Sequence, residues 1–385
     1  MMKYAALILS NFKRHKLRTA LTILSIVVAF VLFAYLAAIR TAFSMGVSVA
    51  GANRLIVRHK ISLIQPLPQA YEAQIEQIDG VADATQASWF GGVYRDKPNA
   101  FAQIAVEPEE FMKTYPEFVV PPAQAETWKK TRTGAIAGRT IAERYGWKIG
   151  DRIPIEATFL RPKTGGNTWT FDLVAVYDGK TKETDTTGFF FRHDYLDENR
   201  FWGQGLTGWY YITIKDPAQA ERIVSAIDAK FANSPAETKT ETEKAFVKGF
   251  AEQMGNIAAI TIAILTAVFF TILLVAGNTM AQAVRERVNE LGVMKAIGFT
   301  DAQVLSMVLA ESLLISFVGG ALGLTLGWLA VSAGDPTGGA LPVFIFPQRD
   351  LLIGVVLVAL LGIVTGMIPA GQAMRLNAVD ALRRE

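Results

Sequence analysis

The chain has 385 residues, of which 51% are hydrophobic, and its mean hydropathy is +0.27. Its formal net charge of +3 is too small to indicate nucleic-acid binding. The absence of cysteine excludes disulfides, thiolate nucleophiles and cysteine-based metal sites. Because the hydrophobic residues are concentrated in separate stretches, the sequence predicts a soluble domain inserted into a membrane scaffold.

Four segments are long and apolar enough to cross a bilayer, whose hydrocarbon core is about 30 Å thick. They lie at residues 21–39, 257–277, 304–331 and 351–370. The first follows a basic cluster from Lys13 to Arg18, as the apolar run of a signal peptide does. Its apolar run is longer than that of a signal peptide and no small-x-small cleavage site follows, so we predict an uncleaved anchor.

Basic residues mark the cytoplasmic side of short connections in membrane proteins. They flank the start of the first segment, the connection between the second and third segments, and the C-terminal tail. The 332–350 connection, in contrast, has only Arg349. We therefore predict a multi-pass membrane protein with both termini in the cytoplasm and residues 40–255 outside the cytoplasm.

The predicted organisation follows from these spans. In chain order it is an N-terminal cytoplasmic amphipathic segment with transmembrane helix 1 (1–39), an extracytoplasmic domain with a stalk (40–255), transmembrane helix 2 (256–278), a cytoplasmic coupling helix (279–302), transmembrane helix 3 (303–331), an extracytoplasmic loop (332–350), transmembrane helix 4 (351–371) and a cytoplasmic tail (372–385).

The inserted region alternates strand-like and helix-like runs, which predicts an α+β domain. Residues 238–256 are polar with spaced apolar residues, so we expect them to continue the second span outward as an amphipathic stalk. Strands are expected at 55–57, 101–106, 171–176 and 210–214, and helices at 68–78, 140–145 and 217–231.

No pattern in the chain indicates a catalytic centre. The only histidines are His15, His59 and His193, which are far apart, so we predict no metal site. The chain has neither a Gly-x-x-x-x-Gly-Lys-[Ser/Thr] string nor a Gly-x-Ser-x-Gly string. We therefore expect no bound cofactor and no ATP hydrolysis by a P-loop of this chain.

The third span carries glycines at four-residue spacing, Gly319, Gly323 and Gly327. Small residues at this spacing let helices approach closely, within one chain or between two copies, although glycine is also common in membrane helices. The same span contains Glu311, which either pairs within the bundle or lies hydrated near the cytoplasmic interface. We favour the interfacial position because a charge at the bilayer centre costs several kcal/mol.

Between the second and third spans, Val284, Val288 and Leu291 fall on one helical face and charged residues cover the rest. This pattern predicts a short amphipathic helix at the membrane surface. An ordinary interfacial connector with solvated charges would have the same composition.

The string Arg285-Glu-Arg-x-x-Glu290-Leu-Gly-Val-Met-Lys-Ala-Ile-Gly298 resembles the coupling segment of MacB/FtsX-like ABC permeases, the type VII or mechanotransmission transporters. Residues 11–26, 138–151 and 369–383 are similar to the family's entry helix, extracytoplasmic signature and C-terminal signature. The resemblance covers essentially the whole chain. The chain departs from the family at Asn377-Ala378, where Asp-Pro is frequent, and in lacking a fused nucleotide-binding domain.

The resemblance implies a non-catalytic permease subunit that pairs with a second permease, identical or homologous. Two separate ABC ATPase subunits would bind ATP and Mg, and the membrane lipid would surround the spans. The residues that the resemblance assigns to ATPase docking are Arg285, Glu286, Arg287, Glu290 and Lys295.

The function that this resemblance implies is the export or extraction of a hydrophobic or amphipathic cargo, such as a lipoprotein, lipid, peptide or drug, with a periplasmic adaptor or carrier as a possible partner. The alternative is a signalling subunit that regulates a periplasmic enzyme or sensor. We favour transport because no feature indicates a hydrolase partner. Aromatic residues of the outer domain are expected mostly in its core, although exposed ones would offer an apolar surface: Trp89, Phe90, Tyr94, Trp169, Phe201, Trp202, Trp209 and Tyr210.

Overall fold

The computed structural model divides into two compact units. The helical unit comprises Met1–Thr41, Asn256–Asp335 and Phe344–Glu385, and the inserted domain comprises Ala42–Gly255 and Pro336–Val343. His15 and the Asn377-Ala378 departure lie outside the described residues. The structure describes residues 16–49, 51–95, 97–98, 101–181, 184–253, 257–334 and 344–375.

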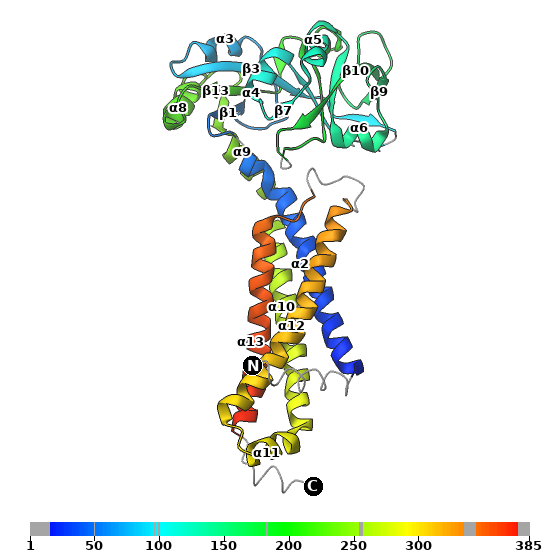
Figure 1. Ribbon diagram of the computed structural model, residues 1–385. Helices are drawn as coiled ribbons and strands as arrows, with labels where there is room; N and C mark the ends of the chain where they lie inside the picture. The colour runs from blue at the N-terminus through cyan, green and yellow to red at the C-terminus, as the bar shows by residue number, and fades with distance from the viewer. Residues whose placement is uncertain are drawn as a thin grey trace. The chain divides into compact units, whose positions relative to one another are not determined.

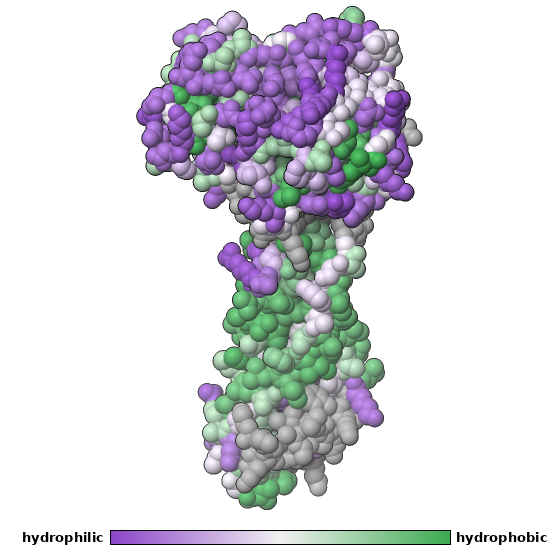
Figure 2. Space-filling model, turned by 45° about the horizontal axis from the view of Figure 1, so that its top comes forward, coloured by the Kyte–Doolittle hydropathy of each residue, from purple (hydrophilic) through white to green (hydrophobic). Residues whose placement is uncertain are grey.

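The helical unit is built from long apolar helices joined by one short helix (Figure 1). Four helices are long and apolar enough to cross a membrane. The described surface of this unit is largely hydrophobic (Figure 2), as a lipid-facing surface is. Its helices are α2 (Lys16–Val49), α10 (Ile257–Glu286), α11 (Val288–Ala296), α12 (Asp301–Ser332) and α13 (Gln348–Met374).

Small residues allow α12 to pack closely on its neighbours. A Cβ atom on Gly323 would lie 2.7 Å from the Cβ of Phe30 in α2, so only glycine fits this contact. On another face of α12, Ser312 Oγ donates a hydrogen bond of 2.8 Å to the carbonyl of Gly362 in α13. The predicted glycine face lies against α2 of the same chain, with Gly319, Gly323 and Gly327 next to Ile26, Phe30 and Ala34.

The inserted domain contains, within its described residues, a mixed sheet of 12 strands in the order β14-β1-β13-β3-β6-β11-β8-β10-β9-β4-β5, with β7 paired to β10. Strands β11 and β6, and β10 and β8, are parallel, whereas the other pairs are antiparallel. A separate pair joins β12 to β2. The strands are β1 (Arg54–His59), β2 (Leu67–Pro68), β3 (Val81–Trp89), β4 (Gly92–Tyr94), β5 (Lys97–Pro98), β6 (Ala102–Val106), β7 (Phe118–Val119), β8 (Gly134–Gly138), β9 (Arg152–Ala157), β10 (Thr168–Gly179), β11 (Gly188–Arg192), β12 (Leu206–Thr207), β13 (Trp209–Ile214) and β14 (Thr238–Thr242).

Short helices pack on this sheet and complete an α+β domain. In α8, Ile223 and Ile227 are buried against the core that Tyr210 and Ile212 of β13 form. The predicted fold class, four membrane helices with an α+β domain inserted after the first, is confirmed. The helices are α3 (Tyr71–Glu76), α4 (Pro108–Thr114), α5 (Pro122–Lys130), α6 (Arg139–Tyr145), α7 (His193–Asn199), η2 (Pro217–Gln219), α8 (Ala220–Lys230) and α9 (Glu243–Gln253).

The predicted amphipathic stalk is wrong at its start. Residues 238–242 are strand β14, which pairs with β1, and α9 begins only at Glu243. The alternating threonines of this stretch favour a strand because β-branched side chains fit a pleated surface. Their hydroxyls are also satisfied there, since Thr238 and Thr240 both donate to Asp228 of α8.

Candidate coupling site

The 279–302 segment is a helix break followed by a short helix. Helix α10 ends at Glu286, α11 starts after Arg287, and Gly298, with a φ of +105°, makes the turn before α12. Thr300 and Gln303 form a capping box that starts α12. The short amphipathic helix predicted to carry Val284, Val288 and Leu291 on one face is therefore interrupted at Arg287. The apolar residues of the pattern still pack in the core: Val284 of α10 and Leu291 of α11, on either side of the break, are both buried in the same cluster.

Ion pairs join this segment to the first and third spans. Arg18 Nη1 of α2 lies 2.6 Å from Glu286 Oε2 of α10. Arg287, at the helix break, lies 2.9 Å from Glu311 Oε2 of α12 and 3.3 Å from Glu290 Oε2 of α11. These charged residues line a cavity of about 400 Å³ between α2, α10 and α12.

Of the two alternatives for Glu311, the structure shows the pairing within the bundle, whereas its depth relative to the membrane interface stays a prediction. Its carboxylate and the guanidinium of Arg287 are both mostly buried, so the pair lies within the bundle. The sequence does not reveal this pair, because α10 has to end at Glu286 before Arg287 reaches α12. A buried charge without such a partner would carry a large desolvation cost.

A third polar link ties the segment to the last span. Lys295 Nζ lies 2.6 Å from Asp301 Oδ1 and donates a hydrogen bond of 2.6 Å to the carbonyl of Met374, at the end of α13. With these contacts, the 279–302 segment is bonded to α2, α12 and α13.

Of the five residues assigned to docking, Arg285 is exposed, whereas Arg287 and Lys295 are largely buried in internal pairs. The docking role of all five stays a prediction. The structure adds an exposed row on α11 and its end, formed by Asn289, Val293 and Ile297 at four-residue spacing, with Ile297 71% exposed. That spacing, on a different face from Val284 and Leu291, is the signal that the sequence analysis missed.

At the base of the inserted domain, the chain that enters it pairs with the chain that leaves it. Strand β1 follows α2 along the chain, and β14 with α9 precedes α10. The two strands are antiparallel neighbours, with Leu55 opposite Thr242 and Val57 opposite Thr240. A side-chain pair reinforces the ladder, because Arg58 Nε lies 3.0 Å from Glu241 Oε1.

Arg54 fixes this pair of segments. Its guanidinium lies 2.6 Å from Glu243 Oε2 at the start of α9 and 2.7 Å from Glu117 Oε1, and it stacks 4.4 Å from the centre of the Tyr115 ring. Tyr115 donates a hydrogen bond of 2.9 Å to the other oxygen of Glu243. Burial opposes the charge of Arg54, but the bonds to Glu117 and Glu243 raise its pKa above the usual value.

The described residues contain no group of three or more His, Cys, Asp or Glu side chains placed to hold a metal ion. His193 is buried, and burial together with the nearby charge of Arg200 lowers its pKa to about 4. Most of the aromatic residues singled out above are in the core, but Trp89, Phe201 and Trp202 are exposed.

The match to a known family falls on the helical unit. Residues 257–378 match the model described as FtsX-like permease C-terminal. This part of the chain is an FtsX-like permease domain, and the resemblance drawn from the sequence is confirmed.

Relatives give the same classification. The chain is 30% identical over 166 residues to the uncharacterized ABC transporter permease YknZ of Bacillus subtilis, covering 41% of this chain and 40% of YknZ. It is 23% identical over 412 residues to the uncharacterized ABC transporter permease MJ1507 of Methanocaldococcus jannaschii, covering 97% and 96%. It is 35% identical over 108 residues to the macrolide export ATP-binding/permease protein MacB of a Shewanella strain, covering 28% and 16%. By these matches the chain is similar to ABC transporter permeases of the MacB/FtsX type.

Solved structures resemble the inserted domain only distantly. The periplasmic region of MacB from Actinobacillus actinomycetemcomitans has a TM-score of 0.37 and 8% identity, covering 53% of this chain and 95% of that one. The extracellular domain of YknZ has a TM-score of 0.35 and 10% identity, covering 49% and 100%.

Proposed function

We propose that this chain is the membrane subunit of an ABC transporter whose ATP and Mg are bound by a separate ATPase, present in two copies. The permease works as a pair with a second permease subunit, in the bacterial inner membrane, with both termini in the cytoplasm and the inserted domain in the periplasm. The observation that carries the proposal is the pairing of β1 with β14, locked by Arg54 and Glu243. This pairing joins β1, which follows the membrane helix α2, to β14, which precedes α9 and the membrane helix α10.

In this mechanism the ATPase docks on the exposed row Asn289, Val293 and Ile297, together with Arg285. Closure of the ATPases pushes the 279–302 segment, and its ion pairs with Arg18 and Glu311 pass that displacement to α2 and α12. Because β1 follows α2 along the chain and β14 with α9 precedes α10, the inserted domain moves as these two helices move. The cargo is a hydrophobic or amphipathic molecule handled on the outer side of the membrane.

The test is purification from native membranes in mild detergent, followed by mass spectrometry of what copurifies. We expect an ATPase with a Walker A motif to copurify with the wild-type chain. The double variant Arg285→Glu, Ile297→Asp should lose it, because both side chains are exposed and neither is used in the internal packing described above. Arg349→Glu, at an exposed position near the start of α13, is the matched control and should retain the ATPase.

An intact, folded wild-type chain that copurifies with no ATPase would contradict the proposal. The identity of a third protein that copurifies distinguishes the transport function from the signalling function. A periplasmic carrier or adaptor supports transport, whereas a bound hydrolase supports the regulation of a periplasmic enzyme.

A further inference from the structure

The inserted domain contains an apolar cavity of about 530 Å³, which is within the size range of small-molecule sites. Its wall comes from segments far apart in the sequence: the turn after β1, the end of β3, the 203–208 loop and α9. All of these belong to one compact unit. The cavity is therefore part of the fold of this domain.

The side chains at its mouth are large, apolar and exposed. Ile64 is 89% exposed and Trp202 is 52% exposed, and Trp89 and Phe159 on the same wall are also exposed. Single exposed apolar residues are ordinary on a protein surface, but a cluster around one cavity marks a binding site. The indole N–H of Trp202 donates a hydrogen bond of 3.3 Å to the backbone carbonyl of Phe159, which holds the Trp202 ring at the mouth.

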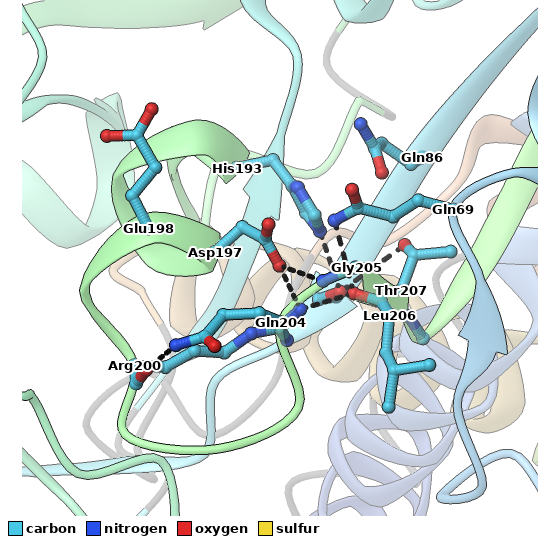
Figure 3. A network of polar contacts seen from close by, with 12 residues as sticks. Gln69, Gln86, His193, Asp197, Glu198, Arg200, Gln204, Gly205, Leu206 and Thr207 are labelled. Carbon is cyan, nitrogen blue, oxygen red and sulfur yellow. Dashed lines mark hydrogen bonds and ion pairs between the residues drawn. The ribbon is translucent and has the colours of Figure 1, made fainter.

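A buried cation lies in the wall of this apolar cavity. Arg200 is 5% exposed, and it is the single charged residue among the described residues that line the cavity. Figure 3 shows its Nη2 bonded to the Asp197 carboxylate and to the carbonyl of Leu206. Its Nε, in contrast, is buried without a hydrogen-bond partner in the part of the chain that the structure describes. A buried donor left without a hydrogen bond carries a free-energy cost, so its presence beside a cavity needs an explanation.

The surroundings of Arg200 add no second positive charge. His193 is buried nearby, its Nε2 is 3.2 Å from Ser88 Oγ, and its low pKa keeps it uncharged at neutral pH. Ser88 and Thr207 bring hydroxyl groups to the same end of the cavity. One end of the cavity is therefore polar, with an Arg200 guanidinium that pairs with Asp197 and keeps its Nε–H unsatisfied among the described residues, and the mouth is aromatic and aliphatic.

We propose that this cavity binds a single-chain anionic amphiphile, with its carboxylate at Arg200 and its hydrocarbon chain between Trp202 and Ile64. The unsatisfied Nε–H of Arg200 complements an anionic head, and the apolar mouth complements the chain. This inference rests on the proposed function and names the class of molecule that the periplasmic domain handles.

The test uses the full chain in lipid nanodiscs and a palmitate analogue that carries a diazirine in its chain. After irradiation and digestion, we expect labelled peptides that contain Trp202, Trp89 or Ile64. Excess palmitate should compete for this labelling, whereas hexadecanol, which has the same chain and no charge, should compete about tenfold less well. In Arg200→Gln the two competitors should become equivalent.

Variants at exposed positions are not expected to unfold the domain, so a loss of labelling in them reports on binding. Trp202→Ala should lower labelling of the cavity peptides about tenfold, because it removes one wall of the chain-binding part. Phe201→Ala is the matched control, since Phe201 is adjacent and exposed but does not line the cavity. Ile64→Ser, at a residue that lines the cavity, should also lower the labelling. Ile61→Ser is its control, because Ile61 is exposed but does not line the cavity.

Labelling confined to the membrane helices, or unchanged in both Trp202→Ala and Ile64→Ser, would overturn the proposal. The measurement needs no ATPase. A chain that binds the amphiphile but copurifies with no ATPase contradicts the proposed function alone, and the reverse result contradicts the binding proposal alone.

Discussion

The Nε of Arg54 lies 2.6 Å from Oε2 of Glu243, and both side chains are almost completely buried. Arg54 begins β1, the first strand of the inserted domain, and Glu243 begins α9, its last helix. One ion pair thus joins the two ends of a domain that is inserted between membrane helices. Any relative displacement of the two ends has to break this pair or move the domain as a body.

Loss of Arg54 should destabilise the inserted domain strongly. Arg54→Met leaves the carboxylates of Glu243 and Glu117 buried without their cation, which should lower the free energy of unfolding by about 3–5 kcal/mol. Glu243→Gln should cost less, because Arg54 keeps Glu117. Thermal unfolding of the full chain in detergent measures both variants.

The matched control is Arg222→Met, which removes an exposed pair with Asp79 and should cost about 0–1 kcal/mol. If Arg54→Met and Arg222→Met shifted the unfolding temperature equally, the buried pair would not hold the base of the domain.

Glycine substitutions in the membrane helices should differ in their effect on stability, according to whether the glycine contacts a neighbouring helix. Gly323→Val should destabilise the helical unit by about 1–3 kcal/mol, because its Cβ would be 2.7 Å from Phe30 Cβ and 2.8 Å from the carbonyl oxygen of Val27. Gly277→Ala in α10 should be neutral or slightly stabilising, since no neighbouring atom lies within 4 Å of its added Cβ. Unfolding in detergent, followed by circular dichroism, compares them. A larger loss in Gly277→Ala would refute the packing.

Glu72 predicts how stability depends on pH. Burial, together with the charges of Glu107 and Glu76, raises its pKa to about 8. The folded domain therefore holds a proton that the unfolded chain releases near its ordinary pKa, about 4.3. Stability should fall as the pH rises from about 5 to 8, and it should change no further from this group above the folded pKa.

Glu72→Gln removes that proton linkage. The variant should unfold at a higher temperature than the wild type at pH 8 and show a smaller difference at pH 5. Glu143→Gln is the control, because Glu143 is exposed on a different helix, α6, and is not among the charges that raise the pKa of Glu72. A Glu72→Gln effect that is the same at both pH values would show that the carboxyl is already ionised in the folded domain.

Local signals in the sequence predict the elements, but long-range contacts decide the site. The four spans follow from length and apolar composition, and the strand at 210–214 follows from its aromatic and β-branched residues, as β13 confirms. The pairing of β1 with β14 joins residues far apart in sequence, and no periodicity indicates it. The partner of Glu311 depends on the helix break at Arg287, which charge patterning does not reveal.

Exposure is the other property that the sequence leaves open. Phe90 and Trp202 are both large aromatics in turn-rich stretches, yet Phe90 is fully buried among Trp169, Phe171 and Phe191 while Trp202 borders the apolar cavity. Only the packing of distant strands separates a core aromatic from a binding one.

The most direct test of the coupling claim is hydrogen–deuterium exchange on the permease–ATPase complex in nanodiscs, with and without a non-hydrolysable ATP analogue. We predict that nucleotide changes the exchange of β1, β14 and α9, and that the complex with Arg54→Met loses this response while it still binds the ATPase. Unchanged exchange throughout the inserted domain, in a complex whose ATPase binds the nucleotide, would contradict the account.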